Sequence, residues 1–137
     1  MRGLHVVADF YDVPENPLLT DANLLRDACV DACKQAGLTV VGEHFHQFAA
    51  IDGSGQAGAT GAVILAASHL AIHTWPERNQ VTLDVYLCDF ALADGACSEA
   101  RAEAVFARIT ELFKPLRART QRLNRGLDGN SVDEKTL

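Results

Sequence analysis

Residues 81–88 alternate without exception between two kinds of side chain. The apolar set is Val81, Leu83, Val85 and Leu87, and the more polar set is Thr82, Asp84, Tyr86 and Cys88. This period of two predicts a β-strand with one face in a core. The other face must meet water, form a site or pack against a second copy. Antiparallel sheets tolerate one uncovered face, so the chain is expected to cover its sheet on one side.

The remaining pattern predicts three more strands and two helices. We expect strands at 3–11, 38–48 and 60–67, one helix from a cap at Thr20 or Asp21 to Gly37, and a second at 98–114. Consecutive strands joined by short turns favour antiparallel pairing. The predicted fold class is therefore α+β: a two-layer sandwich in which an antiparallel sheet of about four strands carries two helices on one face.

The length of 137 residues suits one such core and is too short for two. We expect a single domain over residues 1–125 and a polar, flexible tail over 126–137. The net charge of −6, with dispersed Lys and Arg, argues against nucleic acid as a partner. The Arg-rich residues 117–125 are expected to form a solvated strand or tail. No apolar segment is long enough to span a membrane.

Four cysteines are present, and none forms a CxxC pair: Cys29, Cys33, Cys88 and Cys97. The N-terminus lacks the layout of a signal peptide, so we expect reduced thiols and a cytoplasmic location. Cys29 and Cys33 lie one turn apart on the apolar stripe of the first helix. A zinc or redox role is one interpretation, but we favour core packing, because a free cysteine behaves as a small hydrophobe.

Reactive side chains are densest in the segment that follows the apolar run 61–67. Eleven residues hold a hydroxyl, two imidazoles, an indole and a carboxylate, from Ser68, His69, His73, Trp75 and Glu77. Three hypotheses are open at this point. Ser68 is an ordinary serine at a strand end, or it attacks its own backbone, or the histidines take part in a zinc site. The ligands of that zinc site would be His44, His46, His69, His73 and Cys88.

The segment 67–77 resembles the processing segment of the prokaryotic S-adenosylmethionine decarboxylase proenzymes, whose usual form is Glu-Ser-His-x-x-Ile-His-Thr-Trp-Pro-Glu. Asp84-Val85 followed by Cys88 matches the family's Asp-Val-x-x-Cys at the matching distance. Residues 3–11 and 46–48 resemble the first two strands of the family. The resemblance extends over about residues 1–115.

This resemblance implies a pyruvoyl-dependent lyase, made as a zymogen that cuts itself between Ala67 and Ser68. A pyruvoyl group derived from Ser68 would form a Schiff base with S-adenosylmethionine and accept the electrons left by decarboxylation. The product would supply aminopropyl groups for spermidine synthesis. The family also forms homodimers with sites near the interface, so a homodimer is expected.

The resemblance also assigns roles in self-cleavage. His73 matches the histidine that supports processing, and it would take the α-proton of the ester. Thr60 stands where the family has Ser or Thr, and its hydroxyl would assist the acyl shift. Thr60 and Ser68 have the same parity on the predicted strand 60–67, so they share a face if that strand stays regular.

Four further residues match positions that act on the substrate. Cys88 matches the cysteine that returns a proton to the substrate carbon. Glu77 lies where the family binds the ribose hydroxyls, and Phe48 matches an aromatic residue that stacks on adenine. Asp9 replaces a usual Glu of the first strand.

Two departures from the family keep alternatives open. Position 67 holds Ala where bacterial relatives usually have Glu, and the loop at 49–59 is longer than the usual Pro-Gly turn. One alternative is a pyruvoyl-dependent decarboxylase of arginine or ornithine. Another is an unprocessed, non-catalytic homologue that serves as a binding or regulatory subunit. Retention of Ser68, His73 and Cys88 together favours the active enzyme.

Overall fold

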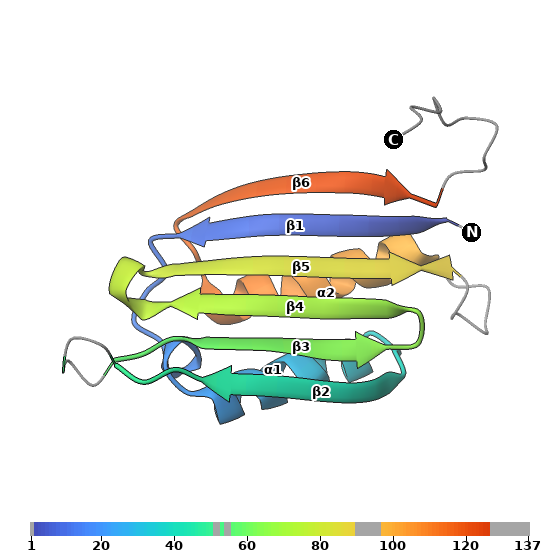
Figure 1. Cartoon of the computed structure of the whole chain (residues 1–137). Helices are drawn as coiled ribbons and strands as arrows, with labels where there is room; N and C mark the ends of the chain where they lie inside the picture. Colours follow the sequence, from blue (N-terminus) through green and yellow to red (C-terminus); the bar gives the residue numbers. More distant parts are fainter. Residues whose placement is uncertain (1, 51–52, 54–55, 90–96, 127–137) are drawn as a thin grey trace, which may run out of the picture.

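The computed structural model describes residues 2–50, 53, 56–89 and 97–126. A six-stranded antiparallel sheet forms one layer, and both helices cover the same face of it (Figure 1). The sheet order is β2-β3-β4-β5-β1-β6. The strands are β1 Gly3–Tyr11, β2 Val40–Gln47, β3 Ala59–Leu65, β4 Ser68–Trp75, β5 Gln80–Cys88 and β6 Arg117–Arg125. The helices are α1 Ala22–Gln35 and α2 Ser98–Phe113, with short 3₁₀ helices η1 Pro17–Leu19 and η2 Pro76–Arg78.

The α+β two-layer class is confirmed, but the predicted number of strands is wrong. The first additional strand, β4, contains most of the reactive segment. It forms because the chain reverses direction at Ala66–Ala67 and then pairs with β3. The second, β6, pairs with β1 along the sheet edge. An edge strand is paired on one side and tolerates exposed charge, so β6 lacks the apolar alternation that marks β5. The predicted tail lies, apart from residue 126, outside the described residues.

The core lies between the apolar sheet face and the two helices. Asp21 caps α1, and its Oδ1 accepts from the N–H groups of Asn23 at 2.8 Å and Leu24 at 3.1 Å. Cys29 and Cys33 are fully buried in this core, which confirms their packing role. Burial raises the pKa of both thiols, that of Cys33 to about 12. Neither helix in the described part of the chain is long and apolar enough to cross a membrane.

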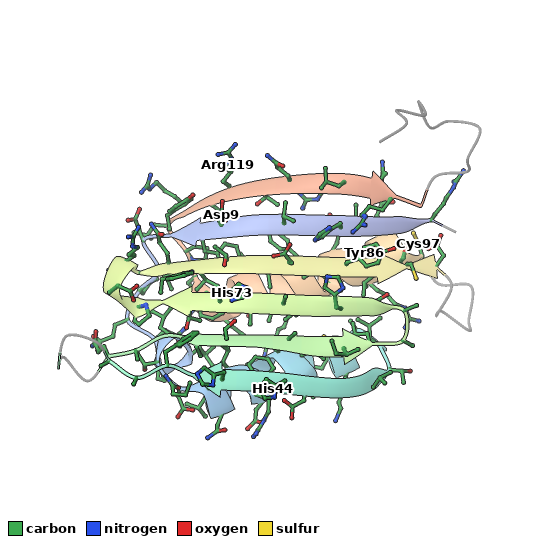
Figure 2. All side chains as sticks on the ribbon, in the orientation of Figure 1. Asp9, His44, His73, Tyr86, Cys97 and Arg119 are labelled. Atoms are coloured by element: carbon green, nitrogen blue, oxygen red, sulfur yellow. The ribbon has the colours of Figure 1, made fainter. Side chains whose placement is uncertain are left out.

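Within the described residues, the opposite face of the sheet carries no helix. Side chains from neighbouring strands form rows across it, because cross-strand partners lie on the same face. One row runs through His46, Thr60, His73, Thr82, Asp9 and Arg119. A second row runs through Ile64, His69, Tyr86, His5 and Leu123. Figure 2 labels Asp9, His73 and Arg119 from the first row and Tyr86 from the second.

Candidate active site

The peptide bond between Ala67 and Ser68 lies at the tip of the hairpin between β3 and β4. Leu65 and Ser68 are the last paired residues, so Ala66 and Ala67 make a two-residue turn. Ala67 has a φ of 56°, in the left-handed region that non-glycine residues seldom occupy. The predicted strand 60–67 therefore ends early, and Ser68 begins a different strand from the one that carries Thr60.

Cys88, at the end of β5, contacts both sides of this peptide bond. Its backbone N–H donates to Ser68 Oγ at 3.1 Å, and its thiol donates to the carbonyl oxygen of Ala67 at 3.3 Å. Ser68 Oγ lies 3.9 Å from Cys88 Sγ. The thiol is almost completely buried. The structure thus brings together three predicted site residues, and the adjoining cavity of about 20 Å³ has room for little more than a water molecule.

Thr60 and His73 form a second pair, well separated from the first. They are cross-strand partners on β3 and β4, and Thr60 Oγ1 lies 2.5 Å from His73 Nδ1. His73 is five residues along β4 from Ser68, which corresponds to about 17 Å at about 3.4 Å per residue. The expectation that Thr60 and Ser68 share one strand face is wrong, because the hairpin turn lies between them.

A cavity of about 410 Å³ adjoins the Thr60–His73 pair. Phe48 and Glu77 also line it, so four of the predicted site residues meet there. Its other walls are Ala49, Ala50, Gln56, Ala57, Gly58, Ala59, Thr74 and Trp75. Phe48 is half exposed, and the His46 ring packs edge-on against it at a centroid distance of 5.0 Å. The volume falls in the range of small-molecule sites.

Asp9 lies on β1, two strands away from His73. The two are linked through Thr82, which is the register partner of both. Two strand spacings correspond to about 10 Å. Asp9 lines a separate cavity of about 150 Å³ together with Arg119, its partner on β6.

A cluster on the uncovered face was missed by the sequence reasoning. His5 Nε2 lies 3.0 Å from Asp84 Oδ1, and the rings of His5, His69 and Tyr86 pack edge-on or tilted. Burial, followed by the nearby His5, lowers the pKa of His69. The guanidinium of Arg125 stacks 4.9 Å from the Tyr86 ring. The alternation in β5 could have placed Asp84 and Tyr86 together on its polar face. Their contact with His5 could not be predicted without knowing that β1 lies next to β5 in the sheet.

The zinc hypothesis is not supported. Within the described residues, no group of three or more His, Cys, Asp or Glu side chains is placed to hold a metal ion. The sheet order explains this result. His44 and His46 lie on the edge strand β2, whereas Cys88 lies on β5, three strands away.

These features agree with comparisons to known proteins. The family model described as S-adenosylmethionine decarboxylase matches residues 4–126, and the chain belongs to this family. The S-adenosylmethionine decarboxylase proenzyme of Thermoplasma volcanium is 36% identical over 125 residues, covering 90% of this chain and 84% of the relative. The proenzyme of the same name from Thermoplasma acidophilum is 34% identical over 141 residues, covering 98% and 95%.

A solved structure is similar over nearly the whole length. The crystal structure of the adenosylmethionine decarboxylase from Aquifex aeolicus VF5 superimposes with a TM-score of 0.77. The two chains are 32% identical, and the match covers 96% of this chain and 97% of the other.

Proposed function

We propose that the chain is a proenzyme that cleaves itself between Ala67 and Ser68 and then decarboxylates S-adenosylmethionine, supplying aminopropyl groups for spermidine synthesis. Family membership supports the substrate. One observation carries the self-cleavage: Cys88 contacts both Ser68 Oγ and the Ala67 carbonyl oxygen. These contacts hold the hydroxyl and the carbonyl on either side of the bond that must break.

In the proposed cleavage, Ser68 Oγ attacks the carbonyl carbon of Ala67, the C–N bond breaks, and an ester forms. Loss of the α-proton of residue 68 then expels the Ala67 carboxylate, and water adds to the dehydroalanine with release of ammonia. The products are a chain of 67 residues and one of 70 residues (137 − 67) that begins with a pyruvoyl group. That group supplies the carbonyl that accepts electrons during decarboxylation.

Cys88 fits the role of proton donor to the substrate carbon. A donor must lie within hydrogen-bond reach of the reacting group, and the Cys88 thiol already lies 3.3 Å from the Ala67 carbonyl oxygen. Its backbone N–H is bound to Ser68 Oγ, so the thiol keeps its position at residue 68.

We propose that the working unit is a homodimer, because one copy does not bring its processing residues together. At about 17 Å along β4, His73 cannot take a proton from residue 68 of the same chain. A second copy, packed face to face with its strands reversed in direction, would bring its own Thr60 and His73 over Ser68.

The uncovered sheet face supports this packing. Ile64 and Leu123 are each about half exposed on it, at 48% and 46%. They flank the His69, Tyr86 and His5 rings in one row of the sheet. Ala62 on β3 and Ala71 on β4 are cross-strand partners, and they lie about halfway along the hairpin between Ser68 and His73. Their small side chains permit two sheets to approach closely there.

The composition of the 410 Å³ cavity favours a nucleoside substrate over arginine or ornithine. Its lining is largely apolar, with Phe48 and Trp75 as aromatic surfaces and Glu77 as the sole carboxylate among the described lining residues. Adenine would stack on Phe48, and Glu77 would accept hydrogen bonds from the ribose hydroxyls. Arginine or ornithine would need a further carboxylate to pair with its cationic side chain, and the described lining residues do not supply one.

We further propose a cytoplasmic location, where reducing conditions keep thiols free. All four cysteines are unpaired with one another, and Cys29, Cys33 and Cys88 are buried.

Intact-mass measurement of the purified chain tests the proposal. We expect two polypeptides, the second lacking an N-terminal amine, and release of CO₂ from S-adenosylmethionine faster than from arginine or ornithine. A Ser68→Ala variant is the matched control and should remain one chain. Faster release from arginine or ornithine would reassign the substrate. A single uncut chain that releases no CO₂ would identify the non-catalytic homologue.

A further inference from the structure

One wall of the 410 Å³ cavity is the backbone of residues 57–59, at the end of the long loop. This wall is anchored by two side chains that have no part in the proposed chemistry. Gln47 is the last residue of β2, and Thr74 lies between His73 and Trp75 on β4. Both make hydrogen bonds to this wall, and each also bonds to a helix: Gln47 to the first residue of α1 and Thr74 to the last residue of η1.

Gln47 uses both ends of its side-chain amide. Nε2 donates to the carbonyl oxygens of Ala57 at 3.1 Å and Gly58 at 3.0 Å. Oε1 accepts from the backbone N–H of Ala22, the first residue of α1, at 2.8 Å. The N–H of Phe48 also donates to the Gly58 carbonyl at 3.0 Å. The wall is therefore tied to a helix end as well as to β2.

Thr74 anchors the other end of the wall from the buried side of β4. Its hydroxyl is buried, donates to the Leu19 carbonyl at 2.8 Å and accepts from the Ala59 N–H at 2.8 Å. Gly58 is pressed against the same residue, since a Cβ at position 58 would lie 2.1 Å from the Thr74 carbonyl oxygen. No side chain fits there without displacing the wall.

We propose that Gln47 and Thr74 are positioning residues that set the affinity of the cavity for its substrate by holding this wall. This inference rests on the proposed function. Neither side chain needs to touch the reacting atoms. Their hydrogen bonds hold the backbone of residues 57–59, which lies between the aromatic surface of Phe48 and the processing hydroxyl of Thr60 in the cavity wall. Affinity for the nucleoside part then depends on them, whereas the chemistry at residue 68 does not.

The test is the separation of KM from kcat, measured on fully cleaved enzyme with S-adenosylmethionine. Thr74→Val keeps the shape and removes the hydroxyl, and Gln47→Glu keeps the acceptor for Ala22 but removes the donor to the wall. Thr74→Val should raise KM about tenfold, the effect of about one buried hydrogen bond. Gln47→Glu, whose bonds to the wall are exposed, should raise KM by a smaller factor, and kcat should stay within about twofold in both variants. Thr74→Ser retains the hydroxyl and should restore KM.

Thr110→Val is the matched control. Its hydroxyl also donates to a backbone carbonyl, that of Phe106 at 2.8 Å, but on α2, so KM should not change. Unchanged KM in both Thr74→Val and Gln47→Glu would overturn the inference, as would a loss confined to kcat.

Hydrogen exchange in the uncleavable Ser68→Ala background gives a readout that needs no activity. The Ala59 amide should exchange at least about tenfold faster when Thr74→Val is added, and Thr110→Val should leave it unchanged. If the parent enzyme proves inactive, the proposed function fails, and exchange alone decides the anchoring. Equal exchange at Ala59 with and without Thr74→Val would then refute it.

Discussion

The backbone N–H of Cys88 donates to the Ser68 hydroxyl at 3.1 Å and so joins the end of β5 to the start of β4. The ladder between these strands runs from the pair Trp75–Gln80 to the pair His69–Tyr86. The Ser68 side chain continues the connection one step beyond the ladder. It is thereby held beside the Ala67 carbonyl, which accepts from the Cys88 thiol.

This contact predicts that Cys88→Ala separates cleavage from decarboxylation. The backbone N–H remains, so Ser68 stays in place and cleavage should slow by less than about tenfold. The proton donor is lost, and kcat should fall by about 100-fold or more. Intact mass and CO₂ release measure the two steps. Cys97→Ala, which removes an exposed thiol, should leave both unchanged, and full turnover by Cys88→Ala would remove the donor role.

The separation of His73 from Ser68 predicts complementation between copies. Ser68→Ala should not cleave, and His73→Ala should cleave at least about 100-fold more slowly than the parent. Co-expression should restore cleavage, confined to the chains that carry His73→Ala, because only these retain Ser68 and receive His73 from the other copy. Intact mass distinguishes the two chains. Mixed dimers that stay uncut would contradict a shared site.

Gly61 predicts a strong local effect on stability. A Cβ there would lie 2.0 Å from the ring of Phe45, its partner on β2. Gly61→Ala should lower the free energy of unfolding by about 1–3 kcal/mol through overpacking, measured by urea denaturation. The matched control is Gly42→Ala on the same strand pair, where a Cβ meets no atom within 4 Å. Equal stability of the two variants would show that Phe45 moves aside freely.

Burial of Cys33 predicts a loss of stability at alkaline pH. Its pKa is raised from 9.0 to about 12 in the folded chain, so between these values the unfolded chain loses a proton that the folded chain keeps. The free energy of unfolding should be constant with respect to this group below pH 9 and fall by about 1.4 kcal/mol per pH unit above it.

Cys33→Ala isolates this contribution. Urea unfolding at several pH values should give a shallower decline above pH 9 in the variant, although the lost side chain lowers stability at every pH. Parallel pH dependence of the parent and the variant above pH 9 would show that the thiol does not ionise on unfolding.

Local patterns predicted the elements that carry a clear signal. The alternation of β5 follows from one buried face, and the structure buries Val81, Leu83 and Val85 as expected. The Asp21 cap and Gly37, with a φ of 74°, bound α1 because their local chemistry favours a helix start and end. Cys29 lies on the helix face that its spacing indicates.

The strand that was missed, β4, lacks such a signal, and so does β6, which was expected only as a solvated strand or tail. The turn at Ala66–Ala67 contains no Gly, Pro, Asn or Asp, the residues that usually mark a reversal. In the edge strand β6, Arg122 is paired to Glu103 on α2 and Arg117 is paired to Asp12. These pairs depend on residues distant in sequence, which a local pattern does not specify.

The sequence by itself determined which residues carry the chemistry, since the spacing of Ser68, His73 and Cys88 is a property of the chain. Only the tertiary structure decided which of them meet. In an antiparallel hairpin, residues equally far from the turn become partners, so Thr60 lies opposite His73 while Ser68 remains at the tip. Cys88 reaches Ser68 because β5 ends beside that tip. The distance of His73 from the scissile bond thus follows from the position of a turn that the local sequence does not mark.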